Sequence, residues 1–228
     1  SLKVPKKDRL LLLFAALSMT MYQWTLFKGL AVGYAGVGGV IVTTVCPIMT
    51  NIFENIREKT IAQPKELIGL ALGCIGTAIL LQVWSLNIEL LFSSGNIYFL
   101  VGGALWAGVN VVAHKCKLDA IAFTFYIFLP GIVLGGFLSR HTDLWVPLTL
   151  GRSFWLPLLY IVSFGTVIAT SWNFKGISLL GAKKGSSFTL LIPSLALILG
   201  WVILKEPLNP FVVVGGGITL AGVYILNR

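Results

Sequence analysis

The chain has 228 residues, of which 57% are hydrophobic and 11% are charged, and its mean hydropathy is +0.91. A soluble domain carries about a quarter of its residues as charged side chains, so this composition excludes an ordinary water-soluble protein and indicates a membrane protein. A net charge of +9 would suggest nucleic-acid binding in a soluble protein. Here the basic residues gather in loops between apolar segments, so no nucleic-acid partner is predicted.

Eight apolar segments follow one another along the chain, each near the ~20 residues that cross a hydrocarbon core of about 30 Å. They cover residues 10–29, 33–53, 67–86, 96–114, 118–138, 154–174, 185–204 and 210–227. Because backbone polar groups must be paired inside a bilayer and no alternating strand pattern occurs, the segments are predicted to be helices. The predicted fold class is an all-α polytopic membrane protein with eight transmembrane helices embedded in the lipid bilayer.

The basic residues are distributed unevenly between the two sides that eight crossings define. Only Lys28, Arg140, Arg152 and Lys205 lie on one side, and the remaining Lys and Arg residues lie on the side of both termini. Short basic loops stay in the cytoplasm. The sequence therefore predicts a multi-pass protein of the cell's inner membrane with both termini cytoplasmic.

The tripeptide FKG closes two distant apolar segments, at residues 27–29 and 174–176. A shift of 146 residues also superimposes several residues of segments one to three on residues of segments six to eight. The pairs are Gly39 with Gly185, Thr43 with Thr189, Pro47 with Pro193, Gly69 with Gly215, and Gly76 with Gly222. Five crossings separate equivalent segments, and an odd number inverts the second copy. Inverted repeats are typical of secondary transporters, whose substrate site lies at the repeat interface near the membrane midplane.

The repeat predicts how the chain is divided. A five-helix unit makes residues 91–228 a complete second repeat and residues 1–90 an incomplete first repeat of three helices. We therefore expect an inverted-repeat helical bundle with eight transmembrane helices here out of ten, two of them preceding this sequence. An authentic eight-helix protein is the alternative.

The stretch PSLALILGWVILKEPLNPFVVVGGGITLAGVYILN, residues 193–227, resembles the end of an EamA-type domain of the drug/metabolite transporter (DMT) superfamily. Pro193, Gly200, Glu206, Gly215 and Gly222 occupy the positions of that pattern. The first repeat departs from it, with Thr60 where the glutamate would stand. The resemblance covers helices three to ten of the family and implies an inverted five-plus-five bundle that moves small metabolites, often outward. Members carry amino acids, nucleotide sugars or phosphorylated sugars, so the fold does not select a substrate.

Polar residues at helical spacing inside the apolar segments predict where the substrate site lies. They form matched stripes on the first and sixth segments, at a shift of 148 residues, and a third stripe on the fourth. The predicted substrate-binding residues are Ser18, Tyr22, Thr25, Trp106, Asn110, Thr166, Thr170 and Asn173. In the alternative interpretation, the hydroxyl groups bond to their own helix or between helices, at roughly 0.6 kcal/mol each.

Small residues four positions apart are predicted to allow close helix packing. The pairs are Gly69 with Gly73, Gly131 with Gly135, and Gly217 with Ala221. The acidic residues all fall near loops or helix ends, and a carboxylate deep in the membrane is the usual proton carrier. Facilitated exchange or uncoupled efflux is therefore predicted, with His114 or a carboxylate in a preceding helix as the alternative proton carrier.

Motifs of rival functions are missing from the sequence. No HExxH, GxSxG or paired-Asp pattern occurs, and the three cysteines lack metal-ligand spacing, so no enzyme, catalytic residue, cofactor or metal is predicted. A channel would need rings of like charge. The predicted function is an exporter of amino acids or related small metabolites by alternating access. A carrier of phosphorylated sugars or nucleotide sugars, with Lys183 and Lys184 binding the anion, is the alternative, and the protein could form a homodimer.

Overall fold

The computed structural model describes residues 4–80, 82–85, 95–138, 145–205 and 210–228. All elements assigned within these ranges are helices, which confirms the predicted all-α class. The α-helices up to residue 138 are α1 (Arg9–Val32), α2 (Ala35–Glu58), α3 (Pro64–Leu80), α5 (Gly95–Lys115) and α6 (Ala120–Leu138). The α-helices after residue 138 are α7 (Val146–Thr149), α8 (Arg152–Tyr160), α9 (Thr170–Leu180), α10 (Ala182–Ser187), α11 (Ile192–Leu199) and α12 (Pro210–Asn227).

Two of the predicted spans are continuous helical paths made of several helix types. A π-helix, η4 (Ile161–Ala169), joins α8 to α9, so the span Arg152–Leu180 runs through three elements. The span Ala182–Ile203 consists of α10, the 3-10 turn η5 (Phe188–Leu191), α11 and most of the π-helix η6 (Gly200–Leu204). Gly181 separates the two spans in a left-handed conformation with φ of 90°, which glycine adopts without a Cβ clash.

Seven helices in the described part of the chain are long and apolar enough to cross a membrane. The remaining predicted segment is α3, which has 17 residues and ends beside residue 81, outside the described ranges. At 1.5 Å per residue its rise is about 26 Å, near the lower limit for a crossing helix. Large apolar side chains such as Leu10, Ile132 and Val133 are more than 70% exposed. This apolar exterior is suited to lipid contact.

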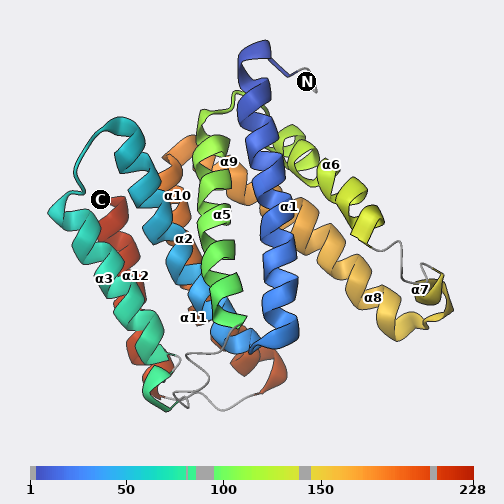
Figure 1. The fold of residues 1–228 in the computed structure, drawn as a ribbon. Coiled ribbons are helices and arrows are strands. Elements are labelled where there is room, and N and C mark those ends of the chain that lie inside the picture. Colours follow the sequence, from blue (N-terminus) through green and yellow to red (C-terminus); the bar gives the residue numbers. More distant parts are fainter. Residues whose placement is uncertain (1–3, 81, 86–94, 139–144, 206–209) are drawn as a thin grey trace.

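The helices form one bundle whose central elements come from both halves of the sequence (Figure 1). Helix α5 packs against α1 and α2, α6 packs against α1 and α9, and α3 pairs with α12 at the edge of the bundle. At one end of the bundle, each terminal segment contacts a segment that is expected to be cytoplasmic. Asp8 accepts a hydrogen bond from the backbone of Lys117, and Lys184 donates one to the backbone oxygen of Asn227.

The contact between α3 and α12 has the pattern of a two-fold axis. A Cβ added at Gly69 would lie 2.9 Å from Gly222 O, and one added at Gly76 would lie 2.7 Å from Gly215 O. The 146-residue shift equates Gly69 with Gly215 and Gly76 with Gly222, so each glycine meets the repeat counterpart of the other. Such reciprocal contacts define an isologous, two-fold interface. This contact agrees with the inverted repeat inferred from spacing, which stays a prediction, and the boundary at residues 90 and 91 lies outside the described residues.

The small-residue pairs predicted for close packing do not all serve that purpose. Gly69 and Gly73 do contact α12 and Leu190. By contrast, a Cβ added at Gly131 or Gly217 would meet no atom of the described residues within 4 Å, so the predictions for these two residues are wrong within the described structure, and the prediction for Gly135 stays a prediction. On α12 the helix contact uses Gly215 and Gly222, which lie on a different face from Gly217. Sequence spacing showed that a small-residue face exists but not which face a neighbour covers.

Candidate functional site

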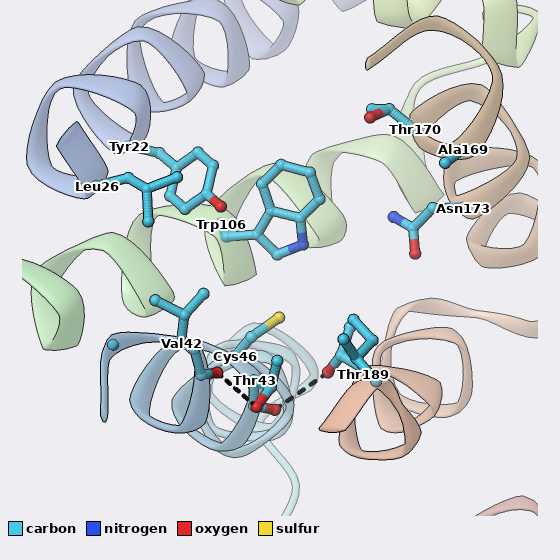
Figure 2. Close-up of a pocket in the computed structure, with 13 residues that line it drawn as sticks. Tyr22, Leu26, Val42, Thr43, Cys46, Trp106, Ala169, Thr170, Asn173 and Thr189 are labelled. Atoms are coloured by element: carbon cyan, nitrogen blue, oxygen red, sulfur yellow. Dashed lines mark hydrogen bonds between the residues drawn. The ribbon is translucent and has the colours of Figure 1, made fainter. Parts of the chain in front are cut away.

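A cavity of about 380 Å³ lies near the middle of the bundle, between helices of both predicted repeats (Figure 2). Its wall comes from α1, α2 and α5 on one side and from α9, η5 and α11 on the other. The lining residues are Tyr22, Leu26, Gly38, Gly39, Val42, Thr43, Cys46, Trp106, Ala169, Thr170, Asn173, Thr189 and Ile192. The sequence predicted a substrate cavity at the interface between the repeats, and the assignment of this cavity to that site stays a prediction.

An aromatic cluster forms one part of the wall. The Trp106 ring lies 4.9 Å from the Tyr22 ring and 5.9 Å from the Phe174 ring, measured between centroids. Phe174 is only 1% exposed, and its ring stacks on the Trp106 ring. It belongs to the second FKG tripeptide, whereas Phe27 of the first is 65% exposed. The repeated letters therefore mark equivalent helix positions whose side chains have different surroundings.

Two repeat-equivalent threonines meet at the opposite wall. The Thr189 hydroxyl lies 3.2 Å from Thr43 O and 2.8 Å from Ser186 O, and the Thr43 hydroxyl donates to Gly39 O at 2.8 Å. Figure 2 shows Thr43 and Thr189 side by side next to Cys46. Because both hydroxyl hydrogens point to backbone oxygens, the hydroxyl oxygens are left as acceptors. These residues were not among the predicted site residues, although the 146-residue shift that pairs them was a signal for the repeat axis.

Two amide side chains have unpaired groups at or beside the cavity. Asn173 lines it, and its buried Nδ2 has no hydrogen-bond partner among the described residues. Asn110 is completely buried behind the wall, where its Nδ2 donates to Cys46 Sγ at 3.3 Å and its Oδ1 has no partner in the described part of the chain. A buried unpaired amide is costly, so a group that bonds Asn173 would be stabilised there.

Four of the eight predicted site residues line the cavity: Tyr22, Trp106, Thr170 and Asn173. Thr25 instead packs beside Gly102 of α5 and donates to Tyr22 O at 2.9 Å. Ser18 is buried, at 5% exposure, and is not among the residues that line this cavity. Helix α5 covers part of the polar stripe on α1. Of the stripe residues Ser18, Tyr22 and Thr25, only Tyr22, with its long side chain, therefore reaches the cavity. A role of Ser18, Thr25 and Asn110 in substrate binding stays a prediction.

Thr166 faces a second cavity of about 740 Å³ between α1, α6 and η4, whose wall also includes Thr20 and Gln23. The polar stripe predicted for the sixth segment assumes an α-helix with 3.6 residues per turn. The π-helix η4 has more residues in each turn, and Thr170 donates to Gly165 O, five residues earlier, at 3.3 Å. This change of period moves Thr166 away from the face that carries Thr170 and Asn173.

The central cavity contains no Lys, Arg, His, Asp or Glu among its lining residues. Lys183, the predicted anion ligand of the alternative function, lies elsewhere: its Nζ is 2.6 Å from Asn55 Oδ1 and 3.0 Å from Glu66 Oε1. The ion pair with Glu66 neutralises its charge. Within the described ranges no three His, Cys, Asp or Glu residues are grouped closely enough to hold a metal ion.

Fold and cavity together define a helical membrane protein with a central cavity between its helices. Residues 93–228, more than half of the chain, match the model of the EamA-like transporter family. The chain therefore belongs to this family, within the drug/metabolite transporter superfamily that the sequence resembles.

Curated relatives are similar over most of this chain. It is 25% identical to the uncharacterized transporter YyaM of Bacillus subtilis, over 82% of this chain and 63% of that protein. It is 27% identical to the uncharacterized transporter sll0355 of Synechocystis, over 96% of this chain and 71% of that protein. The chain thus spans about two thirds of the length of these relatives. A solved crystal structure aligns with a TM-score of 0.76 at 15% identity, over 98% of this chain and 77% of that one, and shows the same fold.

Proposed function

We propose that the protein is a membrane transporter that exports neutral small metabolites, such as amino acids or related compounds, by alternating access between its two repeats. The observation that carries the proposal is the central cavity, whose wall is built by both repeats around the contact between Thr43 and Thr189. Rocking of one repeat against the other would expose such a cavity to each side in turn. The names of the relatives as transporters support the same class over an enzyme.

The chemistry of the cavity supports a neutral or zwitterionic substrate. Transfer of a net charge out of water is costly unless an opposite charge compensates, and none of the lining side chains supplies one. Hydroxyl oxygens of Thr43 and Thr170 and the amide of Asn173 offer hydrogen bonds, while Tyr22 and Trp106 offer an aromatic surface. An apolar or aromatic amino acid fits this combination. A phosphorylated sugar would lack a basic partner among the lining residues.

The two ends of the bundle differ, which supports a conformation in which the central cavity is closed toward the end that holds the termini. The lining reaches Gly38 and Gly39, in the first turns of α2 and far from the chain termini. At the terminal end, Lys183 joins α10 to α2 and α3 through Asn55 and Glu66. Opening toward that end would require these contacts to break, which is the kind of change that alternating access needs.

Ligand-dependent thermal stability of the purified full-length protein tests the substrate class. Phenylalanine is expected to stabilise the protein by RT ln(1 + [L]/Kd), about 2.7 kcal/mol at one hundred times Kd. Glucose 6-phosphate and UDP-glucose, as matched anionic probes, are expected to have no effect. Stabilisation by the phosphorylated compounds alone would overturn the neutral-substrate proposal. Efflux from preloaded vesicles, compared with uptake, then measures the direction of transport.

We also propose that the protein lies in the inner membrane with both termini in the cytoplasm, on the basis of the uneven basic residues. In a variant without native cysteines, a cysteine replacing Lys65 is expected to react with a membrane-impermeant maleimide only in inside-out vesicles. A cysteine replacing Lys28 is expected to react only in right-side-out vesicles. Both native side chains are exposed, so access to the reagent is matched. The reverse labelling pattern would refute the orientation. A homodimer stays a prediction.

A further inference from the structure

Glu54 is a buried carboxylate on α2. It lies one turn before the end of α2, where its residue is only 2% exposed. Neither carboxylate oxygen accepts a hydrogen bond from a described residue, and the close ionic contact is Arg57 Nη2, 2.5 Å from Oε2. An ionised carboxylate buried in this way is expensive unless it is fully paired. The sequence had placed this residue among acidic groups at helix ends, with no sign that it is buried.

Glu54 lines a small cavity of about 210 Å³ at the end of the bundle that holds the termini. The cavity shares no lining residue with the central one. Its wall combines Glu54 and Glu58 of α2, His114 of α5 and the turn between α9 and α10. A Cβ added at Gly181 in that turn would lie 3.8 Å from His114 Cε1, so the turn lies next to the imidazole ring, whose residue is exposed. Parts of both predicted repeats therefore meet around one buried carboxylate.

Charged groups from each neighbouring helix surround the carboxylate. Arg57 and Glu58 share α2 with it, and His114 and Lys115 on α5 are close enough to interact with its charge. Lys183 and Lys184 of α10 line the same cavity, and Glu66 of α3 is paired with Lys183. A change in the charge of Glu54 would thus act on the same set of contacts that joins α2, α3 and α10 at this end.

We infer that Glu54, with His114 on the wall of the same cavity, is a proton-binding site that couples proton movement to transport. The step is a simple protonation: a proton from the cytoplasmic water forms an O–H bond to a carboxylate oxygen, and its release restores the carboxylate. The 146-residue shift equates Glu54 with Gly200, so the other repeat has no carboxylate at this position. Protonation therefore changes the charge at one end of the bundle only. Its coupling to transport rests on the proposed function, whereas proton binding does not.

Infrared difference spectroscopy of the full-length protein in lipid, titrated with acid and base, tests proton binding without any substrate. We expect a carboxyl carbonyl band that appears on acidification and is lost in Glu54→Gln. The control Glu58→Gln removes a carboxylate on the same helix whose side chain is 45% exposed, and it should keep the band. Glu54→Asp should restore a band at a shifted frequency. A band that persists unchanged in Glu54→Gln, or one lost only in Glu58→Gln, would overturn the inference.

Transport in reconstituted vesicles tests the coupling. With radiolabelled phenylalanine, the ratio of pH-gradient-driven transport to exchange is expected to collapse in Glu54→Gln and to persist in Glu58→Gln. A structural role alone would lower both rates together and leave the ratio unchanged, which would refute coupling. If the wild type does not move phenylalanine, the proposed substrate class fails, and the infrared titration still decides whether Glu54 binds a proton.

Discussion

Gly215→Ala is expected to lower the free energy of unfolding by about 3 kcal/mol, at the upper end of the usual cost of overpacking. A Cβ at this position would lie 2.5 Å from Leu80 N and 2.6 Å from Gly76 O. Both are backbone atoms, so no side-chain rotation can relieve the clash, and α12 would have to move away from α3. This displacement would break the reciprocal glycine contact at the two-fold axis. Denaturation in mixed detergent and SDS micelles measures the change.

Gly217→Ala is the matched control on the same helix. No atom of the described part of the chain lies within 4 Å of a Cβ added there, so the methyl group would project away from the described neighbours. Because alanine favours helix over glycine, we expect an unchanged or slightly increased free energy of unfolding, by at most about 1 kcal/mol. Equal losses of stability in the two variants would show that α12 packs against α3 through a different face.

Asn173→Leu is expected to weaken substrate binding about 10- to 100-fold, or about 1.4 to 2.8 kcal/mol, without loss of stability. The two side chains are similar in size, but leucine cannot bond a polar group of the substrate. The buried Nδ2 of Asn173 has no partner among the described residues, so its removal also removes a desolvation penalty. Stability of the unliganded protein should therefore stay constant or rise. Affinity is measured by calorimetry with phenylalanine, and stability by thermal unfolding.

A loss of substrate affinity without a loss of stability would distinguish a binding role of Asn173 from a structural one. If Asn173 only supported the fold, the variant would lose stability and affinity together. Ser178→Ala serves as the control, because Ser178 lies on the same helix α9, is exposed, and bonds only to the backbone of Lys175 in the described structure. It should change neither quantity. Unaltered affinity in a stable Asn173→Leu protein would remove this residue from the proposed site.

The sequence predicted the helices well because composition is a strong constraint in a membrane. A segment that lies in lipid must satisfy its backbone internally, so long apolar runs become helices whatever their neighbours are. The spacing between equivalent residues also predicted the inverted repeat. The close approach of Thr43 to its counterpart Thr189 agrees with that pairing, because residues near a two-fold axis meet their counterparts. Gly69 and Gly76 lie farther from the axis, and each meets the counterpart of the other.

The sequence alone therefore determined the membrane class, the positions of the helices, the internal symmetry and the resemblance to the EamA-type family. Only the tertiary structure decided which face of each helix lines a cavity. Lipid is as apolar as a protein core, so hydrophobicity does not distinguish a lipid-facing side from a packed one, as Gly217 and Gly215 show. The π-turns of η4 altered the helical period and redirected Thr166. The tertiary structure also buried Glu54 and placed it on one cavity with His114 of α5 and the α9–α10 turn, an arrangement of distant segments that no local pattern encodes.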